Sequence, residues 1–115
     1  MFKGLGQLGD MAKMMKAAKD MQERMASLQD GLGRITVTGE SGAGLVQVRA
    51  TAKGELTGLS IDPSILVASE KEIVEDLILA AIRDAQARAT VKAQEEQRKL
   101  LEELGLPTDV NLPPL

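Results

Sequence analysis

The stretch Thr38-Gly39-Glu40-Ser41-Gly42-Ala43-Gly44-Leu45-Val46 decides the fold, because its three glycines separate a helical pattern from an alternating one. Glycine adopts positive φ without a steric clash at Cβ, so we expect Gly39, Gly42 and Gly44 to let the chain reverse. The residues on both sides alternate apolar with polar, which is the period of a β-strand. The stretch therefore predicts a hairpin turn.

A phosphate-binding loop is the alternative interpretation of the same glycines. Such a loop follows a strand and leads through Gly-Lys-Ser or Gly-Lys-Thr into a helix, whose amide groups then face the phosphate. Here Leu45-Val46-Gln47-Val48 continues as an alternating strand instead. We therefore favour a structural turn.

One long helix is predicted before the turn, with its apolar residues at steps of three and four, as in a coiled-coil seam. These residues are Leu8, Met11, Met15, Ala18, Met21, Met25, Leu28 and Leu32. Gly31 and Gly33 supply its end, and residues 1–7, which are broken by glycine, are expected to be loose. A methionine stripe at this spacing is typical of core or helix–helix packing, although methionine-rich faces also serve as binding surfaces.

Three short strands are predicted around and after the turn, at residues 34–38, 45–52 and 56–61. Their apolar residues alternate, and Lys53-Gly54-Glu55 separates the second strand from the third. The simplest arrangement is an antiparallel meander. Its two edges remain open to a partner, which favours a dimer.

A second long helix is predicted over residues 70–104, where no proline or glycine occurs. Asp62-Pro63-Ser64 before it predicts a tight turn or a single helical turn, and Ser69-Glu70-Lys71-Glu72 has the spacing of a capping box. At about 1.5 Å per residue the helix is roughly 52 Å long, which exceeds the diameter of a compact domain of this size. We expect its alanine-rich, charged part, residues 85–97, to project.

Residues 105–115 contain three prolines and predict an extended tail.

Composition restricts the function. The 115 residues are one domain's length, and they include one aromatic residue and six methionines, which predicts a modest core supplemented by a partner subunit. The chain has no cysteine and no histidine, which excludes disulfides, thiolate nucleophiles, imidazole bases and nearly all zinc sites. No constellation of carboxylates indicates catalysis. We expect a non-enzymatic cytosolic protein without metal, cofactor or membrane segment.

Basic side chains gather on both predicted helices. The candidates are Lys13, Lys16 and Lys19 on the first helix, and Arg83, Arg88 and Lys92 on the last. Charged stripes of this kind are normal on solvated helices, where neighbours such as Asp20, Glu95 and Glu96 balance them. The net charge of −3 does not by itself indicate a nucleic-acid partner. From these residues alone, a solvated surface and a binding patch both remain open.

Three parts of the chain together resemble the YbaB/EbfC family of bacterial nucleoid-associated proteins. They are Gly4-Leu5-Gly6 with the methionines that follow, the glycine-rich turn at 38–46, and Ile61-Asp62-Pro63-Ser64 before a long helix. The resemblance covers nearly the whole chain as a single domain, residues 1–115. It implies an α+β fold of helix, three-stranded antiparallel meander and long helix (α-β-β-β-α), assembled as a tweezer-like homodimer.

The resemblance also implies function. A member of this family is expected to bind double-stranded DNA through its first and last helices, with little or modest sequence preference, in the cytoplasm on the nucleoid. Lys13, Lys16 and Lys19, with Arg83, Arg88 and Lys92, are then the candidate phosphate contacts. The alternative is a protein–protein adaptor in a DNA recombination or replication assembly, which the acidic charge, the methionine stripe and the proline-rich tail favour.

Overall fold

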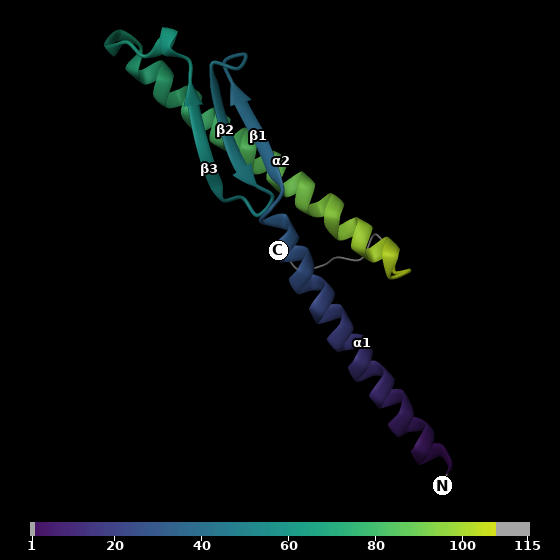
Figure 1. Ribbon diagram of the computed structural model, residues 1–115. Helices are drawn as coiled ribbons and strands as arrows, with labels where there is room; N and C mark the ends of the chain where they lie inside the picture. Colours follow the sequence, from purple (N-terminus) through teal and green to yellow (C-terminus); the bar gives the residue numbers. More distant parts are fainter. Residues whose placement is uncertain (1, 108–115) are drawn as a thin grey trace.

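The computed structural model describes the backbone of residues 2–107 and the side chains of residues 9–107. The elements are helix α1 (Phe2–Leu32), strands β1 (Thr36–Ser41), β2 (Val46–Thr51) and β3 (Leu56–Ile61), and helix α2 (Lys71–Glu103), as Figure 1 shows. Two single 3-10 turns, Pro63–Ile65 and Ala68–Glu70, connect β3 to α2. The predicted α+β order is thus confirmed. Most of the expected proline-rich tail, residues 108–115, lies outside the described residues.

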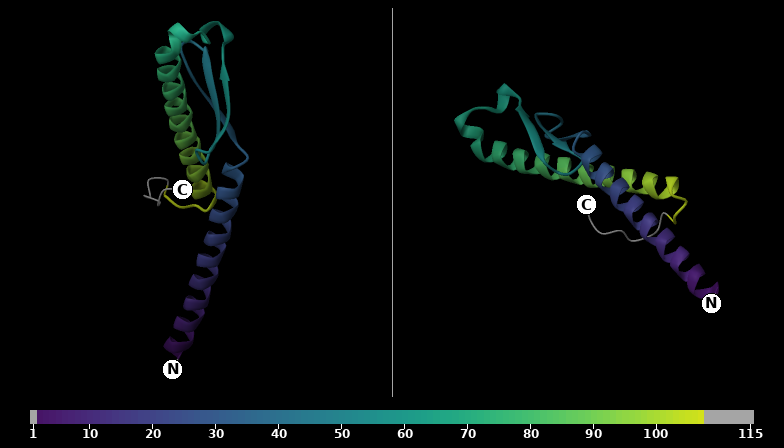
Figure 2. Two further views of the ribbon diagram at one scale, coloured as in Figure 1. Left: turned by 90° about the vertical axis from the view of Figure 1, so that its left-hand side faces the viewer. Right: turned by 60° about the horizontal axis from the view of Figure 1, so that its bottom comes forward.

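The molecule is elongated, with extents of 83 × 22 × 19 Å. Its Cα radius of gyration is 21.7 Å, whereas a compact chain of about 100 residues has about 13 Å. Helix α2 lies along one face of the sheet, and α1 leaves the end of this α/β body as a long arm (Figures 1 and 2). Helix α1 begins at Phe2, earlier than the expected start near Leu8. The glycines at positions 4, 6 and 9 lie within the helix and do not interrupt it. Each costs only about 1 kcal/mol relative to alanine and keeps its backbone hydrogen bonds.

The sheet is an antiparallel meander in the order β1-β2-β3, as predicted. Strand β1 begins two residues later than expected and continues through Gly39, which pairs with Val48. The pair Ser41 and Val46 closes the hairpin. Gly39 therefore belongs to a strand and not to the turn, which corrects the expectation from sequence.

The chain reverses between Ser41 and Val46. Gly42, Ala43 and Gly44 have positive φ angles of 59°, 54° and 90°, a conformation that glycine adopts at little cost and alanine rarely. The hairpin continues directly into β2, so no helix N-terminus faces these glycines. The segment is a structural turn.

Small side chains form the core between the sheet and α2. Val46, Val48 and Ala50 of β2 pack against Ala81 and Ala85 of α2, and all five are buried. Ala85 and Ala89, at the start of the segment 85–97 that was expected to project, are therefore part of a packing surface. Alanine contributes little apolar area, which favours a projecting segment, but its small size lets a strand approach the helix backbone.

Strand β1 and helix α2 approach each other closely at Gly39. A Cβ atom at this position would lie 2.6 Å from both the Ala81 carbonyl oxygen and the Ala85 Cα. No side chain fits there. Gly39 and the alanines of α2 thus set the distance between β1 and α2.

The predicted capping box does not form at the start of α2. The N-cap residue is Glu70, and its side chain makes no capping hydrogen bond. Ser69 lies inside the preceding 3-10 turn, so it does not have the extended conformation that an N-cap side chain needs. The turn at Asp62 does form, since Asp62 Oδ1 accepts a hydrogen bond from the Ser64 amide at 2.9 Å.

The methionines in the outer part of α1 are uncovered in the single chain, whereas Met21 and Met25 are half-buried. Met11 is 59% exposed, and Met14 and Met15 are each 71% exposed. These side chains are therefore not part of the core of one chain, and their packing against another helix remains a prediction.

Candidate nucleic-acid interface

The three candidate lysines of α1 lie on the arm that extends from the body. Lys13, Lys16 and Lys19 are exposed, and none of them takes part in an ion pair among the side chains that the structure describes. At about 100° per residue, they occupy the side of α1 opposite Met14 and Ala18. No acidic residue lies between positions 11 and 19. This part of the arm is a basic surface, which we call the lysine face.

Arg83 lies on the outer side of α2. It follows the buried Ala81 by two residues, which places it on nearly the opposite side of the helix from the sheet. Its side chain is exposed and forms no ion pair within residues 9–107. Arg83 is thus a second site of free positive charge.

Arg88 is engaged within the fold. Its Nε donates to Asp84 Oδ2 at 3.1 Å, and the same oxygen accepts the Glu40 backbone amide at 2.9 Å. The hydrogen bond from Glu40 and, next, the one from Arg88 lower the pKa of the Asp84 carboxyl group. Asp84 therefore links α2 to the outer edge of β1, and Arg88 supports that link.

We expect Asp84→Ala to lower the urea midpoint of unfolding at pH 7, because the Glu40 amide loses its acceptor. Since the pKa of Asp84 is lowered on folding from 3.8, its contribution is complete above that value and is lost as the pH falls through the folded pKa. The midpoints of the variant and the wild type should therefore converge in strong acid. Arg88→Gln, the matched control, should change the midpoint at pH 7 by less. Equal midpoints of Asp84→Ala and wild type at pH 7 would contradict this role.

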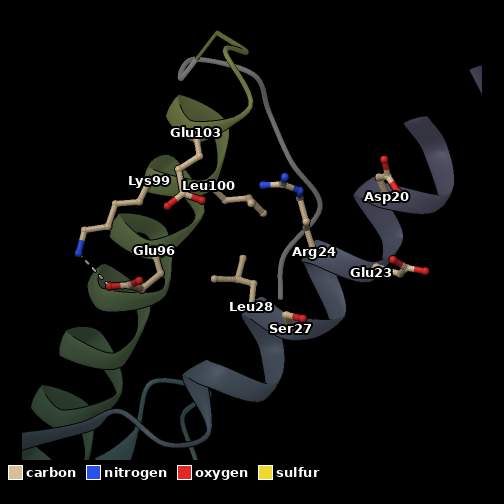
Figure 3. A pocket seen from close by; sticks show the side chains of 9 residues that line it. All are labelled: Asp20, Glu23, Arg24, Ser27, Leu28, Glu96, Lys99, Leu100 and Glu103. Carbon is tan, nitrogen blue, oxygen red and sulfur yellow. Dashed lines mark hydrogen bonds and ion pairs between the residues drawn. The ribbon is translucent and has the colours of Figure 1, made fainter. Parts of the chain in front are cut away.

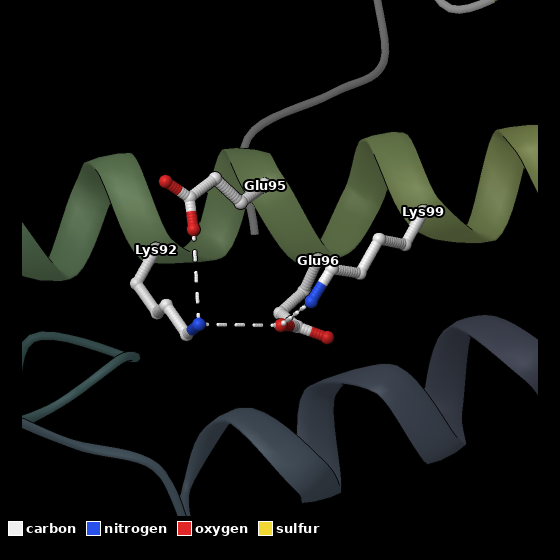
Figure 4. A network of polar contacts seen from close by, with 4 residues as sticks. All are labelled: Lys92, Glu95, Glu96 and Lys99. Carbon is white, nitrogen blue, oxygen red and sulfur yellow. Dashed lines mark hydrogen bonds and ion pairs between the residues drawn. The ribbon is translucent and has the colours of Figure 1, made fainter.

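Lys92 belongs to a balanced cluster of charges on α2 (Figure 4). Its Nζ lies 3.7 Å from Glu95 Oε2 and 3.6 Å from Glu96 Oε1, and Lys99 Nζ lies 3.1 Å from the same Glu96 oxygen. The hydrogen bond from Lys99 is the main cause that lowers the pKa of Glu96, and Lys92 adds to it. Two cations and two anions cancel here, so Lys92 offers less free positive charge than the lysine face does.

A cleft of about 630 Å³ lies between α1 and the last turns of α2 (Figure 3). Leu28 and Leu100 contribute apolar surface to it. Its charged lining residues are Asp20, Glu23, Arg24, Glu96, Lys99 and Glu103. Four acidic groups against two basic ones make this cleft unfavourable for a phosphate backbone.

The six candidate residues thus do not form one patch. The lysine face and Arg83 carry exposed, unpaired charge, whereas Arg88 and Lys92 are held by neighbouring carboxylates. The spacing of Asp84 from Arg88 and of Lys92 from Glu96 was visible in the sequence as i,i+4 pairs. The contact of Asp84 with Glu40, 44 residues away, had no local signal.

Within residues 9–107 no three acidic side chains are grouped so that they could bind a metal ion. Among the described helices, none combines the length and the apolar character that crossing a membrane requires.

Comparison with known proteins identifies the family. Residues 7–104 match the model of the YbaB/EbfC DNA-binding family. A nucleoid-associated protein of Nitrobacter winogradskyi is 48% identical over 100 residues, which are 87% of this chain and 94% of the relative. One of Nitrobacter hamburgensis is 45% identical over 91% of this chain and 99% of the relative.

The fold has a counterpart among solved structures. The crystal structure of an uncharacterized protein from Helicobacter pylori matches with a TM-score of 0.62 and 28% sequence identity, over 82% of this chain and 94% of the other. The family match extends from α1 to the end of α2 and so includes the lysine face and Arg83. The chain belongs to the YbaB/EbfC DNA-binding family of nucleoid-associated proteins.

Proposed function

We propose that this protein binds duplex DNA as a homodimer, through its helical arms and with little or modest sequence preference. The observation that carries the proposal is the lysine face, which presents three unpaired cations on the projecting half of α1. Basic side chains that neutralise phosphates give affinity without reading base sequence. On this proposal the protein acts in the cytoplasm, on the nucleoid, and is not an enzyme.

The distribution of charge supports one position for the DNA. Within one chain, the cleft between α1 and α2 is lined mainly by carboxylates, so a duplex is repelled from it. The lysine face lies farther out on α1, on the side opposite the methionines. We therefore place the duplex between the α1 arms of two chains, with Lys13, Lys16 and Lys19 as the principal contacts and Arg83 as an additional one. Arg88 and Lys92 contribute less, because carboxylates already neutralise them.

A mobility-shift titration over a salt series tests the proposal. The logarithm of the binding constant should fall linearly with the logarithm of the salt concentration, with a slope of about −0.9 for each phosphate contact. Six lysines in a dimer predict a slope near −5. Unrelated duplexes of equal length should bind within about tenfold of one another. No shift at low salt would refute DNA binding, and a slope near zero would refute the phosphate contacts.

The uncovered methionines favour a second candidate, a protein–protein adaptor in a recombination or replication assembly. Met11, Met14 and Met15 form an exposed, adaptable surface. Affinity purification with nuclease treatment separates the two functions. A stoichiometric protein partner that survives nuclease supports the adaptor, whereas partners that disappear with the nucleic acid support DNA binding.

A further inference from the structure

The sheet has a face that none of the described helices covers. In β2, Val46, Val48 and Ala50 point towards α2 and are buried. Gln47 and Arg49 alternate with them and are exposed. Helix α2 lies on the first of these two faces (Figure 2). We call the opposite face, which carries Arg49, the outer face of the sheet.

Arg49 lies across the outer face and against β3. The register places it directly opposite Gly58, which has no side chain. A Cβ atom at Gly58 would lie 2.8 Å from Arg49 Cζ and 2.9 Å from Arg49 Nε. The guanidinium group therefore fills the space that a side chain at position 58 would need.

A β-bulge beside this pair brings the glycine into position. Ala50 pairs with Leu56, and an unbroken register from that pair would place Thr57 opposite Arg49. The register shifts by one residue instead, so Thr57 is the extra residue and Gly58 is opposite Arg49. Bulges often re-aim a side chain at a functional position. Here the bulge gives the Arg49 guanidinium a surface on which to lie.

The charge of Arg49 is not neutralised by a neighbour. Arg49 forms no ion pair among the side chains of residues 9–107. The adjacent row of the sheet contains Glu40, opposite Gln47. However, Glu40 Oε2 is turned towards the hairpin turn, where it would lie 3.8 Å from a Cβ atom at Gly44. Arg49 is thus an exposed and oriented cation.

We propose that Arg49 binds a phosphate group of the DNA backbone, as a contact separate from the lysine face. The inference rests on the proposed function. A guanidinium group can donate two parallel hydrogen bonds to one phosphate, which the ammonium group of lysine cannot. Ser60 follows Gly58 by two residues on the same face, and its exposed hydroxyl can donate a further hydrogen bond. Because Arg49 already lies in one position, less rotamer entropy is lost on binding.

The outer face lies within reach of a duplex that is bound by the arm. From Lys19 to Leu32, α1 is about 20 Å long. From Leu32 to Thr38, which pairs with Arg49, the chain spans at most about 20 Å. A duplex rises about 3.4 Å per base pair, so about 12 base pairs cover the whole distance. One duplex is therefore long enough to contact both the lysine face and Arg49.

A mobility-shift titration with a duplex of about 30 base pairs tests the contact over a salt series. Arg49→Gln removes one phosphate contact from each chain, so in a dimer the salt slope should become shallower by about 2. Affinity at moderate salt should fall about five- to tenfold.

Arg34→Gln is the matched control, because Arg34 is equally an arginine near the sheet but already pairs with Asp30 at 3.0 Å. Its affinity should fall by less than about twofold. An equal loss in the two variants would overturn the inference and leave the proposed function standing. No binding by the wild type would overturn both.

Gly58→Ala tests the orientation of Arg49 without a change of charge, since Gly58 acts as a positioning residue. The new Cβ would displace the guanidinium, which is the end of a flexible side chain and can move away. The urea midpoint of unfolding should therefore stay that of the wild type. DNA binding should weaken by about threefold, because Arg49 must then be ordered on binding. Wild-type affinity in Gly58→Ala would show that Gly58 does not orient the contact.

Discussion

Gly39→Ala is expected to lower the free energy of unfolding by about 3 kcal/mol or to prevent folding. The added Cβ would lie 2.6 Å from the Ala81 carbonyl oxygen and from the Ala85 Cα. Both atoms belong to the backbone of α2, so no rotamer change can relieve the clash. Strand β1 would have to move away from the helix and uncover Val48, its partner in β2. Urea unfolding followed by circular dichroism measures the loss.

Gly33→Ala is the matched control for this prediction. The nearest atom to a Cβ at Gly33 is the Asp30 carbonyl oxygen at 3.4 Å, an ordinary contact. The control should stay within about 0.5 kcal/mol of the wild type. If both alanine variants unfold at the same urea concentration, the close approach of β1 to α2 is not what Gly39 provides.

Replacement of Lys13, Lys16 and Lys19 together by glutamine is expected to weaken DNA binding at least about 100-fold at moderate salt. The three lysines are exposed and unpaired among the described side chains, so their removal breaks no ion pair there. In a dimer six phosphate contacts disappear, and the salt slope should become shallower by about 5. The loss should be similar on unrelated DNA sequences, because phosphates carry no sequence information.

The matched control removes the same number of lysines elsewhere: Lys53, Lys71 and Lys99 to glutamine. Lys71 and Lys99 already pair with Glu75 and Glu96. This variant has the same net charge as the first, so its binding should fall much less if position matters. An equal loss in both variants would show that net charge, and not the lysine face, governs affinity.

Local signals were sufficient for the order of the elements. The alternation around the glycine-rich turn predicts the hairpin, and the proline at position 63 predicts a tight turn or a single helical turn. The absence of any glycine or proline between residues 70 and 104 predicts one continuous helix, which is α2. Each of these depends on backbone preferences within a few residues. Such preferences act in the same way whatever packs against the segment.

Contacts between distant segments could not be predicted in this way. The sequence predicts that Gly39 is part of the turn, since glycine is common in turns and nothing nearby shows that Ala85 will lie against it. The same limit, that contacts between distant segments have no local signal, applies to the candidate nucleic-acid interface. The lysine face could be read from spacing, whereas the cleft that brings Glu23 towards Glu103 depends on the angle between α1 and α2. That angle follows from the whole α/β body and not from either helix.

The hydrogen bonds between α2 and β1 also protect the protein against aggregation. An unprotected edge strand offers unpaired amide and carbonyl groups to any other strand, and this hazard grows with local concentration. On the outer edge of β1 the Glu40 amide is bound by Asp84, and the Ser41 hydroxyl donates to the Leu77 carbonyl oxygen of the same helix. Helix α2 therefore guards this edge against strand addition. If many copies of the protein bind side by side along DNA, these contacts of α2 keep their β1 edges from pairing with one another.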